Sequence, residues 1–219
     1  MNYYVGLSLA SSSGMDSGVA VVDENNTLIT LDKLYKMEDV IYFFEHFSSL
    51  KNSKICASVP IDRTMLEGKW RILSKPYQAV ATNQNIPNRD NWTQRLSNRG
   101  TEYFKELSNR GITVNRFDIY ITRQSMHLNS CYKDRSPADC KFLQQALKYE
   151  WGFDSLPANM MPMSHMEAIL GAILAKEKEK NPQNIRTLYN IKGLNVIDIK
   201  ENLRISTDVY NFEKELVSI

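Results

Sequence analysis

The sequence lacks the features that mark several specialised classes of protein. Its three cysteines, Cys56, Cys131 and Cys140, include no C-x-x-C pair, which argues against both a disulfide framework and a tetrahedral zinc site. No apolar stretch approaches the roughly 18 residues of a membrane span, and no basic segment followed by an apolar run resembles an export signal. We therefore expect a cytoplasmic protein with reduced thiols and no membrane contact.

Neither sign of charge dominates the chain. The 27 lysines and arginines nearly balance the 25 aspartates and glutamates, and the formal net charge is +2. Any contact with nucleic acid is therefore expected at a local patch, because a global positive field is absent. With 219 residues, 42% of them hydrophobic, the chain has the length for one well-packed domain, and we expect a single domain over residues 1–219.

Common catalytic motifs are also absent. The sequence has no G-x-x-x-x-G-K-[ST] phosphate loop, no G-x-S-x-G nucleophile elbow and no G-x-G-x-x-G dinucleotide fingerprint. The histidines His46, His127 and His165 are scattered, and His165-x-Glu167 lacks the second histidine that a zinc-binding helix needs four residues away. A histidine metal site is therefore not expected.

The first part of the chain has the pattern of an antiparallel meander. Residues 3–9, 19–22 and 27–35 are rich in β-forming residues, and turn signals separate them. Residues 37–50 then show helical spacing, with carboxylates at the start that suit the positive end of a helix dipole. Residues 54–61 form a nearly continuous apolar strand, which after a helix can pair in parallel with an inner strand.

Helices and strands alternate through the rest of the chain. Gly111 is a helix stop, and Ser136 followed by Pro137 is a helix start. The expected elements are a helix over residues 90–110, a strand over residues 114–122, a loop over residues 124–135, a helix from Ser136 to Trp151, a helix from Ser164, and a closing hairpin over residues 188–198.

The order β-β-β-α-β-α-β-α predicts an α/β fold of the RNase H-like type. We expect a mixed five-stranded sheet, with three antiparallel strands followed by two parallel ones, flanking helices and a C-terminal hairpin. This order concerns topology and not activity. A sugar-kinase or actin-like phosphotransferase shares the opening pattern, but it needs two such domains and this chain has the length for one.

Three carboxylates are placed to meet in such a fold. The ends of the first and fourth strands lie side by side, and a carboxylate on a late helix can reach them. Asp62 follows the fourth strand, Asp118 lies within the fifth, and Glu167 lies on the late helix. Two-metal hydrolysis of phosphodiester bonds needs such converging carboxylates, because oxygen ligands suit Mg²⁺ or Mn²⁺.

Each of these carboxylates also has a structural interpretation, which stays open. Asp62 is suited to capping the backbone after its strand. Asp118, by alternation, lies on the solvent side of a half-buried strand. Glu167 is three residues beyond Ser164 and fits a capping box.

The first strand carries Ser8 where a bridging carboxylate is expected. A neutral hydroxyl is a poor ligand for a hard divalent cation. Asp16, in the following turn, is the only nearby acidic replacement, and turn preferences favour a hairpin role for it.

A basic and aromatic patch is the candidate nucleic-acid contact. Lys69, Trp70, Arg71, Lys75 and Tyr77 can hold phosphates and stack on bases. A solvated loop with one anchoring tryptophan is the favoured alternative interpretation.

Small residues recur at helical spacing on the helix that begins at Ser164. Ala168, Gly171, Ala172 and Ala175 predict that this helix closely approaches a neighbouring sheet or helix. Such an approach would hold Glu167 near the strand ends.

The sequence resembles the predicted RNase H-like nucleases of domain-of-unknown-function family 429. The matching segments are residues 5–10 with 18–21, residues 57–62 and residues 165–175. The resemblance implies an RNase H-like fold, with Asp62, Asp118 and Glu167 as metal-binding catalytic residues. The departures are Ser8 in place of the family's aspartate, Ser58 where an acid occurs in the fourth strand, and His165 where the helix motif is often acidic.

Two functional hypotheses follow. The chain is either a hydrolase of nucleic-acid phosphodiester bonds that uses Mg²⁺ or Mn²⁺ in a reduced site, or a catalytically inactive RNase H-like binding or scaffold protein. The replaced carboxylate at Ser8 is the feature that divides them.

Overall fold

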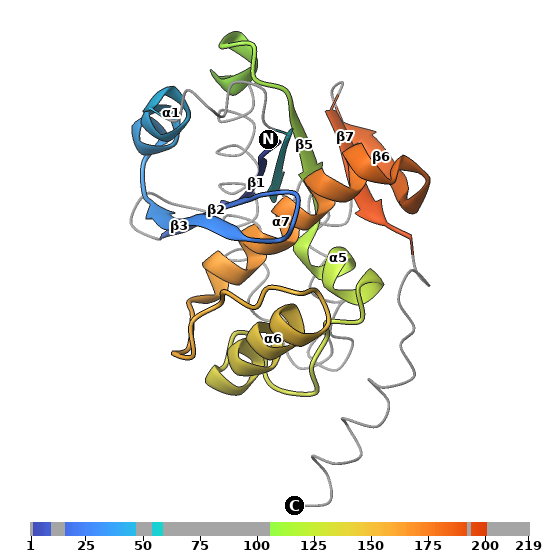
Figure 1. The fold of residues 1–219 in the computed structure, drawn as a ribbon. Coiled ribbons are helices and arrows are strands. Elements are labelled where there is room, and N and C mark those ends of the chain that lie inside the picture. The colour runs from blue at the N-terminus through green and yellow to red at the C-terminus, as the bar shows by residue number, and fades with distance from the viewer. Residues whose placement is uncertain (1, 10–15, 47–53, 59–105, 192–193, 201–219) are drawn as a thin grey trace, which may run out of the picture.

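The computed structural model describes residues 2–9, 16–46, 54–58, 106–191 and 194–200, which form a mixed α/β arrangement (Figure 1). Seven strands of this part of the chain make one sheet in the order β3-β2-β1-β4-β5-β7-β6. No helix in these ranges is long and apolar enough to cross a membrane.

The chain opens with the expected antiparallel meander. Strand β1 pairs antiparallel with β2, and β2 pairs antiparallel with β3 through a register shift between Val21 and Val22. The strands are β1 (Tyr4–Ser8), β2 (Ser17–Val22) and β3 (Leu28–Leu34). The prediction of a three-stranded meander is confirmed.

The next two strands run parallel to β1. Strand β4 (Lys54–Ser58) pairs with β1 so that Ser8 lies beside Ser58, and β5 (Val114–Phe117) pairs with β4 so that Ser58 lies beside Phe117. The C-terminal ends of β1, β4 and β5 therefore meet at one edge of the sheet. Ser8 and the residue after β5, Asp118, are both at this edge.

The C-terminal hairpin is present, but it belongs to the sheet. Strands β6 (Ile185–Ile191) and β7 (Leu194–Ile199) pair antiparallel, and β7 pairs parallel with β5 through Arg116 and Val196. The expected count of five strands is thus wrong, because the hairpin extends the sheet beyond β5.

Four α-helices and a short 3₁₀ helix have both of their ends within the described residues. They are α1 (Met37–His46), α5 (Ile119–Ser125), α6 (Pro137–Tyr149), α7 (Met163–Lys180) and the 3₁₀ helix η3 (Pro182–Asn184). Ser136 caps α6 by accepting from the Asp139 N–H at 3.2 Å, as the sequence predicted. Residues 106–109 are helical and stop before Gly111, whose φ is 73°; the rest of the helix expected over residues 90–110 lies outside the described residues.

The strand predicted over residues 114–122 is wrong in its second half. Strand β5 ends at Phe117, and α5 begins at Ile119. Asp118 starts the helix, since its Oδ1 accepts hydrogen bonds from the N–H groups of Tyr120 at 2.9 Å and Ile121 at 3.0 Å. This cap overrides the strand preference of the β-branched residues that follow.

Helix α7 lies directly on the backbone of β1 and β2 (Figure 1). A Cβ atom added at Gly6 would lie 1.7 Å from the Ala168 carbonyl oxygen, and one added at Gly18 would lie 2.0 Å from the Ser164 oxygen. Only glycine leaves room for this contact. The predicted close approach of the small-residue helix is therefore confirmed.

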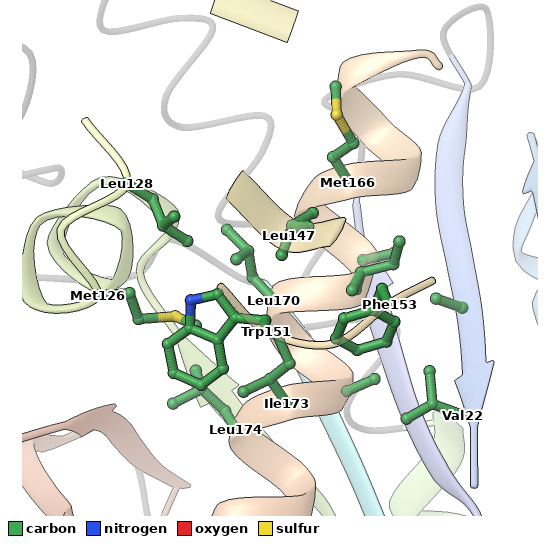
Figure 2. Close-up of a cluster of buried hydrophobic side chains, with 14 of the residues drawn as sticks. Val22, Met126, Leu128, Leu147, Trp151, Phe153, Met166, Leu170, Ile173 and Leu174 are labelled. Atoms are coloured by element: carbon green, nitrogen blue, oxygen red, sulfur yellow. The ribbon is translucent and has the colours of Figure 1, made fainter. Parts of the chain in front are cut away.

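Two apolar clusters cover the two faces of the sheet. The larger cluster lies on the α7 face, where Leu170, Ile173 and Leu174 of α7 gather with Trp151 and Phe153 (Figure 2). The other cluster joins α1 to the opposite side chains of β1 and β2. Because side chains alternate along β1, Ser8 shares the α7 face with Gly6.

Candidate functional site

The site begins with a contact between the end of β1 and the first turns of α7. The Ser8 hydroxyl donates to Glu167 Oε2 at 2.7 Å. Both residues are buried, with 4% of Ser8 and 3% of Glu167 exposed. The contact follows from the glycine packing, since Ala168, the neighbour of Glu167, lies against Gly6.

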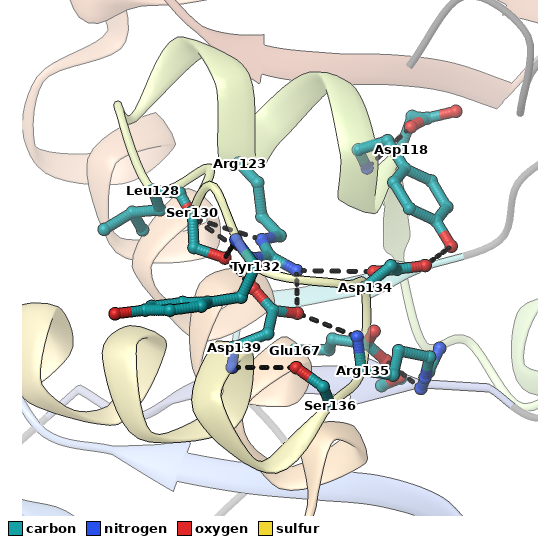
Figure 3. Close-up of polar contacts among 12 residues, drawn as sticks. Asp118, Arg123, Leu128, Ser130, Tyr132, Asp134, Arg135, Ser136, Asp139 and Glu167 are labelled. Carbon is teal, nitrogen blue, oxygen red and sulfur yellow. Dashed lines mark hydrogen bonds and ion pairs between the residues drawn. The ribbon is translucent and has the colours of Figure 1, made fainter. Parts of the chain in front are cut away.

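A guanidinium completes the surroundings of this carboxylate. Arg135 Nη2 donates to the same oxygen, Glu167 Oε2, at 3.1 Å. The arginine side chain remains 47% exposed, so the ion pair joins a buried anion to a cation at the surface. Figure 3 shows Arg135 and Glu167 within a larger set of polar contacts.

The protonation of Glu167 is set by opposing effects. Burial raises the pKa of the Glu167 carboxyl above its ordinary value, against the opposing effects of the Arg135 charge and the Ser8 hydrogen bond. The net direction is upward. The ion pair and hydrogen bond thus offset only part of the cost of removing this carboxylate from water.

Asp139 anchors the loop that carries Arg135. Arg123 donates from Nη2 to Asp139 Oδ1 at 2.7 Å and from Nη1 to Oδ2 at 3.3 Å, and Ser130 Oγ donates to Oδ1 at 2.6 Å. The Arg135 backbone N–H donates to Oδ2 at 2.9 Å. Burial alone would raise the pKa of Asp139, but the hydrogen bonds from Arg123 and Ser130 bring it below its ordinary value.

Arg123 also ties this loop to the end of α5. Its Nε and Nη2 donate to the Leu128 carbonyl oxygen at 3.2 Å and 3.1 Å, and its Nη1 lies 3.8 Å from Asp134 Oδ1. Tyr120 donates its hydroxyl to the other oxygen of Asp134 at 3.3 Å. Residues 128–135, expected only as an irregular loop, are thus held by buried polar contacts (Figure 3).

Two predicted site residues, Asp118 and Glu167, lie in surroundings that differ from those suggested by the sequence. Asp118 is 3% exposed, so its expected position on the solvent side of a strand is wrong. Its carboxylate caps α5. Glu167 does not form the expected capping box, because α7 has Pro162 as its N-cap and no side-chain cap, while Ser164 Oγ donates to Asp16 Oδ2 at 2.8 Å.

Asp16, which precedes β2, contacts the first turn of α7 through Ser164. It accepts from Ser164 and lies 3.5 Å from Lys33 Nζ. Although burial alone would raise the pKa of Asp16, these two partners keep it below its ordinary value. Its carboxylate also suits the positive end of the helix dipole.

Several predicted site residues lie outside the described residues. They are Asp62, which was expected as a metal ligand, and the nucleic-acid patch of Lys69, Trp70, Arg71, Lys75 and Tyr77. Their roles stay predictions.

The described side chains do not fit a two-metal centre. Within this part of the chain, no three side chains of His, Cys, Asp or Glu are grouped so that they could hold a metal ion. Glu167 is already paired with a guanidinium, and its other partner is a hydroxyl that donates a proton to it. A centre built on Asp62, Asp118 and Glu167 would need Asp62 as well as a rearrangement of Arg135.

Sequence reasoning missed the residues that hold the loop. Arg123, Arg135 and Asp139 were not candidates. The S-x-x-D spacing from Ser136 to Asp139 is a capping signal that could have drawn attention to Asp139. Nothing local to Arg135 indicates a partner on α7.

Comparison with known proteins adds little to this site. The sequence matches no family model and no curated protein. A solved structure, T. thermophilus RuvC in complex with Holliday junction substrate, matches with 10% sequence identity and a TM-score of 0.39, over 82% of this chain and 96% of that one. A similarity this distant carries no argument about function. The order β3-β2-β1-β4-β5 within the sheet is the order predicted from the sequence.

Proposed function

We propose that this chain is an RNase H-like protein of the nuclease type that acts on nucleic acid, with impaired metal-dependent hydrolysis of phosphodiester bonds. The observation that carries the proposal is the hydrogen bond from Ser8 to Glu167 at the end of β1. The contact joins the end of β1 to the late helix, and Ser8 supplies a hydroxyl where the resemblance implies a carboxylate. Fewer anionic ligands mean weaker binding of a hard divalent cation.

The order and direction of the strands support the RNase H-like fold on which the proposal rests. Ser8, Ser58 and Phe117 are adjacent across β1, β4 and β5, and the late helix α7 brings Glu167 to the same edge. This is the arrangement expected from the resemblance to domain-of-unknown-function family 429. By that resemblance, Ser8 occupies the position of the family's first-strand aspartate.

Asp62, Asp118 and Glu167 are the proposed catalytic and metal-binding residues, with Mg²⁺ or Mn²⁺ as the metal. Asp62 follows β4 in the sequence, and Asp118 follows β5, the neighbouring strand. Carboxyl ends of neighbouring parallel strands are common places for such ligands.

A second candidate is a catalytically inactive RNase H-like binding or scaffold protein. The ion pair between Arg135 and Glu167 favours it, because the guanidinium supplies positive charge that a metal ion would otherwise bring. The two candidates share the fold and differ in whether metal binds.

Calorimetric titration with Mn²⁺ separates the candidates. It is done on the wild type, on Asp62→Asn and on Asp154→Asn, whose residue is exposed and is not one of the proposed ligands. We expect weak saturable binding that Asp62→Asn abolishes and Asp154→Asn preserves, with slow cleavage of labelled DNA or RNA. No binding at millimolar Mn²⁺ and no cleavage would reject the nuclease and leave the inactive protein.

A further inference from the structure

Arg135 is held in an uncommon backbone conformation. Its φ is 58°, in the left-handed region that non-glycine residues rarely adopt. Such a conformation persists where surrounding contacts determine it, and it is frequent at binding sites. Here the backbone N–H is bound to Asp139 and the guanidinium to Glu167, so both ends of the residue are fixed.

The guanidinium keeps most of its donors for another partner. An arginine side chain has five N–H donors in a planar fork. Its hydrogen bond and ion pair in the described part of the chain both use Nη2. With 47% of the side chain exposed, the remaining donors are available to a ligand that approaches from solvent.

The same loop presents a second cation and an aromatic ring. Lys133 is exposed and has no ion pair among the described residues. Tyr132 is 45% exposed, and Figure 3 shows its ring extending away from the polar network. Two anions of the network, Asp139 and Glu167, are buried. The third, Asp134, is 23% exposed, and its two carboxylate oxygens face Arg123 and the Tyr120 hydroxyl. The exposed part of the loop is therefore cationic and aromatic, which is the combination that binds single-stranded nucleic acid.

We propose that the loop segment Tyr132–Arg135 binds single-stranded nucleic acid without a metal ion. Arg135, positioned by Glu167, donates to a backbone phosphate. Lys133 contacts a neighbouring phosphate, and Tyr132 stacks on a base. This proposal rests on the proposed function for its class of ligand, and it assigns to Arg135 the cationic role that a metal ion has in a complete two-metal site.

The test is fluorescence anisotropy of a labelled single-stranded oligothymidylate in EDTA, at several salt concentrations. The variants are Arg135→Gln, Arg135→Lys, Lys133→Gln and Tyr132→Ala, and the matched control is Lys141→Gln, an exposed lysine on α6. Circular dichroism and the thermal midpoint are recorded for each. Lys133→Gln and Tyr132→Ala change exposed side chains, so they test the surface even if Arg135→Gln fails to fold.

We expect the wild type and Lys141→Gln to bind equally in EDTA. Arg135→Gln should weaken binding about tenfold, the scale of one charge-assisted hydrogen bond, and Arg135→Lys should restore part of it. Arg135→Gln and Lys133→Gln should each lower the dependence of log affinity on log salt by about 0.7, the value for one phosphate contact to a single strand. Tyr132→Ala should weaken binding without changing this slope.

Two results would overturn the proposal. One is wild-type protein that binds the oligonucleotide only when Mn²⁺ is present, and the other is unchanged affinity in Lys133→Gln and Tyr132→Ala. Failure of the proposed nuclease looks different, since it is an absence of Mn²⁺ binding and cleavage while binding in EDTA persists.

Discussion

The Ser8 hydroxyl donates to Glu167 at 2.7 Å, although 159 positions separate the two residues in the sequence. The contact joins the end of β1 to α7 and places a neutral donor beside a buried carboxylate. Arg135 adds the positive charge from a third segment. This arrangement satisfies Glu167 without a metal ion.

Replacing Ser8 by aspartate would place a second carboxylate against Glu167. We expect Ser8→Asp to lower the free energy of unfolding by roughly 1–3 kcal/mol in EDTA, because like charges would be buried together. Mn²⁺ should then restore stability by binding between them. The measurement is the thermal midpoint in EDTA and in Mn²⁺.

Ser8→Ala is the control for this experiment. It removes the hydrogen bond at a cost of about 1 kcal/mol, and it should not respond to Mn²⁺. Equal midpoints of Ser8→Asp in EDTA and in Mn²⁺ would contradict the idea that one carboxylate restores the metal site.

Glu167 should make stability depend on pH. Burial raises the pKa of Glu167, against the effects of Arg135 and Ser8. The folded state then holds the proton more tightly than the unfolded chain, whose glutamate pKa is about 4.3. The stabilisation that comes from protonated Glu167 is therefore fully present below about pH 4.3, and it is lost as pH rises through the raised pKa of the folded state.

Glu167→Gln removes this titration. The free energy of unfolding of the wild type, minus that of Glu167→Gln, should fall as pH rises from about 4 towards neutrality and beyond. Urea unfolding of both proteins at several pH values measures the difference. A difference that stays constant, or that rises with pH, would show that Glu167 does not titrate with a raised pKa.

The packing of α7 on β1 should make Gly6 intolerant of any side chain. A Cβ atom at Gly6 would overlap the Ala168 carbonyl oxygen, which is backbone and cannot rotate away. We expect Gly6→Ala to cost at least about 3 kcal/mol, the upper end of overpacking, or to prevent folding. Chemical denaturation measures this cost.

Gly111→Ala is a suitable comparison. Gly111 has a φ of 73° and no heavy atom within 4 Å of the added Cβ. Its substitution should cost only about 1–2 kcal/mol of backbone strain. If both variants lost the same stability, close packing would not be the reason for glycine at position 6.

Asp139 should contribute strongly to stability through the loop that it anchors. Asp139→Asn removes the nearer charged partner of the buried Arg123 and leaves only Asp134, at 3.8 Å, and we expect a loss of roughly 3 kcal/mol. The pKa of Asp139 is lowered, so its contribution is present above the ordinary aspartate pKa and is lost as pH falls through the lowered value. Urea unfolding at neutral and acidic pH measures both effects.

Asp154→Asn is the matched control, because Asp154 is exposed. It should change the free energy of unfolding by no more than about 0.5 kcal/mol. A similarly small effect of Asp139→Asn would mean that the loop is held by its apolar contacts instead.

Local patterns in the sequence determined the elements whose stability is local. Alternating β-formers with turn signals predicted the meander of β1, β2 and β3, and the Ser136 cap with Pro137 predicted the start of α6. The small residues of α7 predicted its contact with the sheet. For the strands and the α6 cap, the signal lies within the element that it predicts. For α7, the small residues predict a close approach but not which strands it contacts.

The tertiary structure alone decided the features that join distant segments. One local feature was also missed, since the Asp118 cap on Tyr120 and Ile121 ended β5 against the strand preference of the β-branched residues after it. The closing hairpin joined the sheet beside β5, which no pattern within the hairpin encodes. Arg135 reached Glu167 because the Asp139 anchor and the glycine contacts of α7 bring the loop and helix together. Charge and hydrogen-bond partners depend on distance in space, and the sequence alone records only distance along the chain.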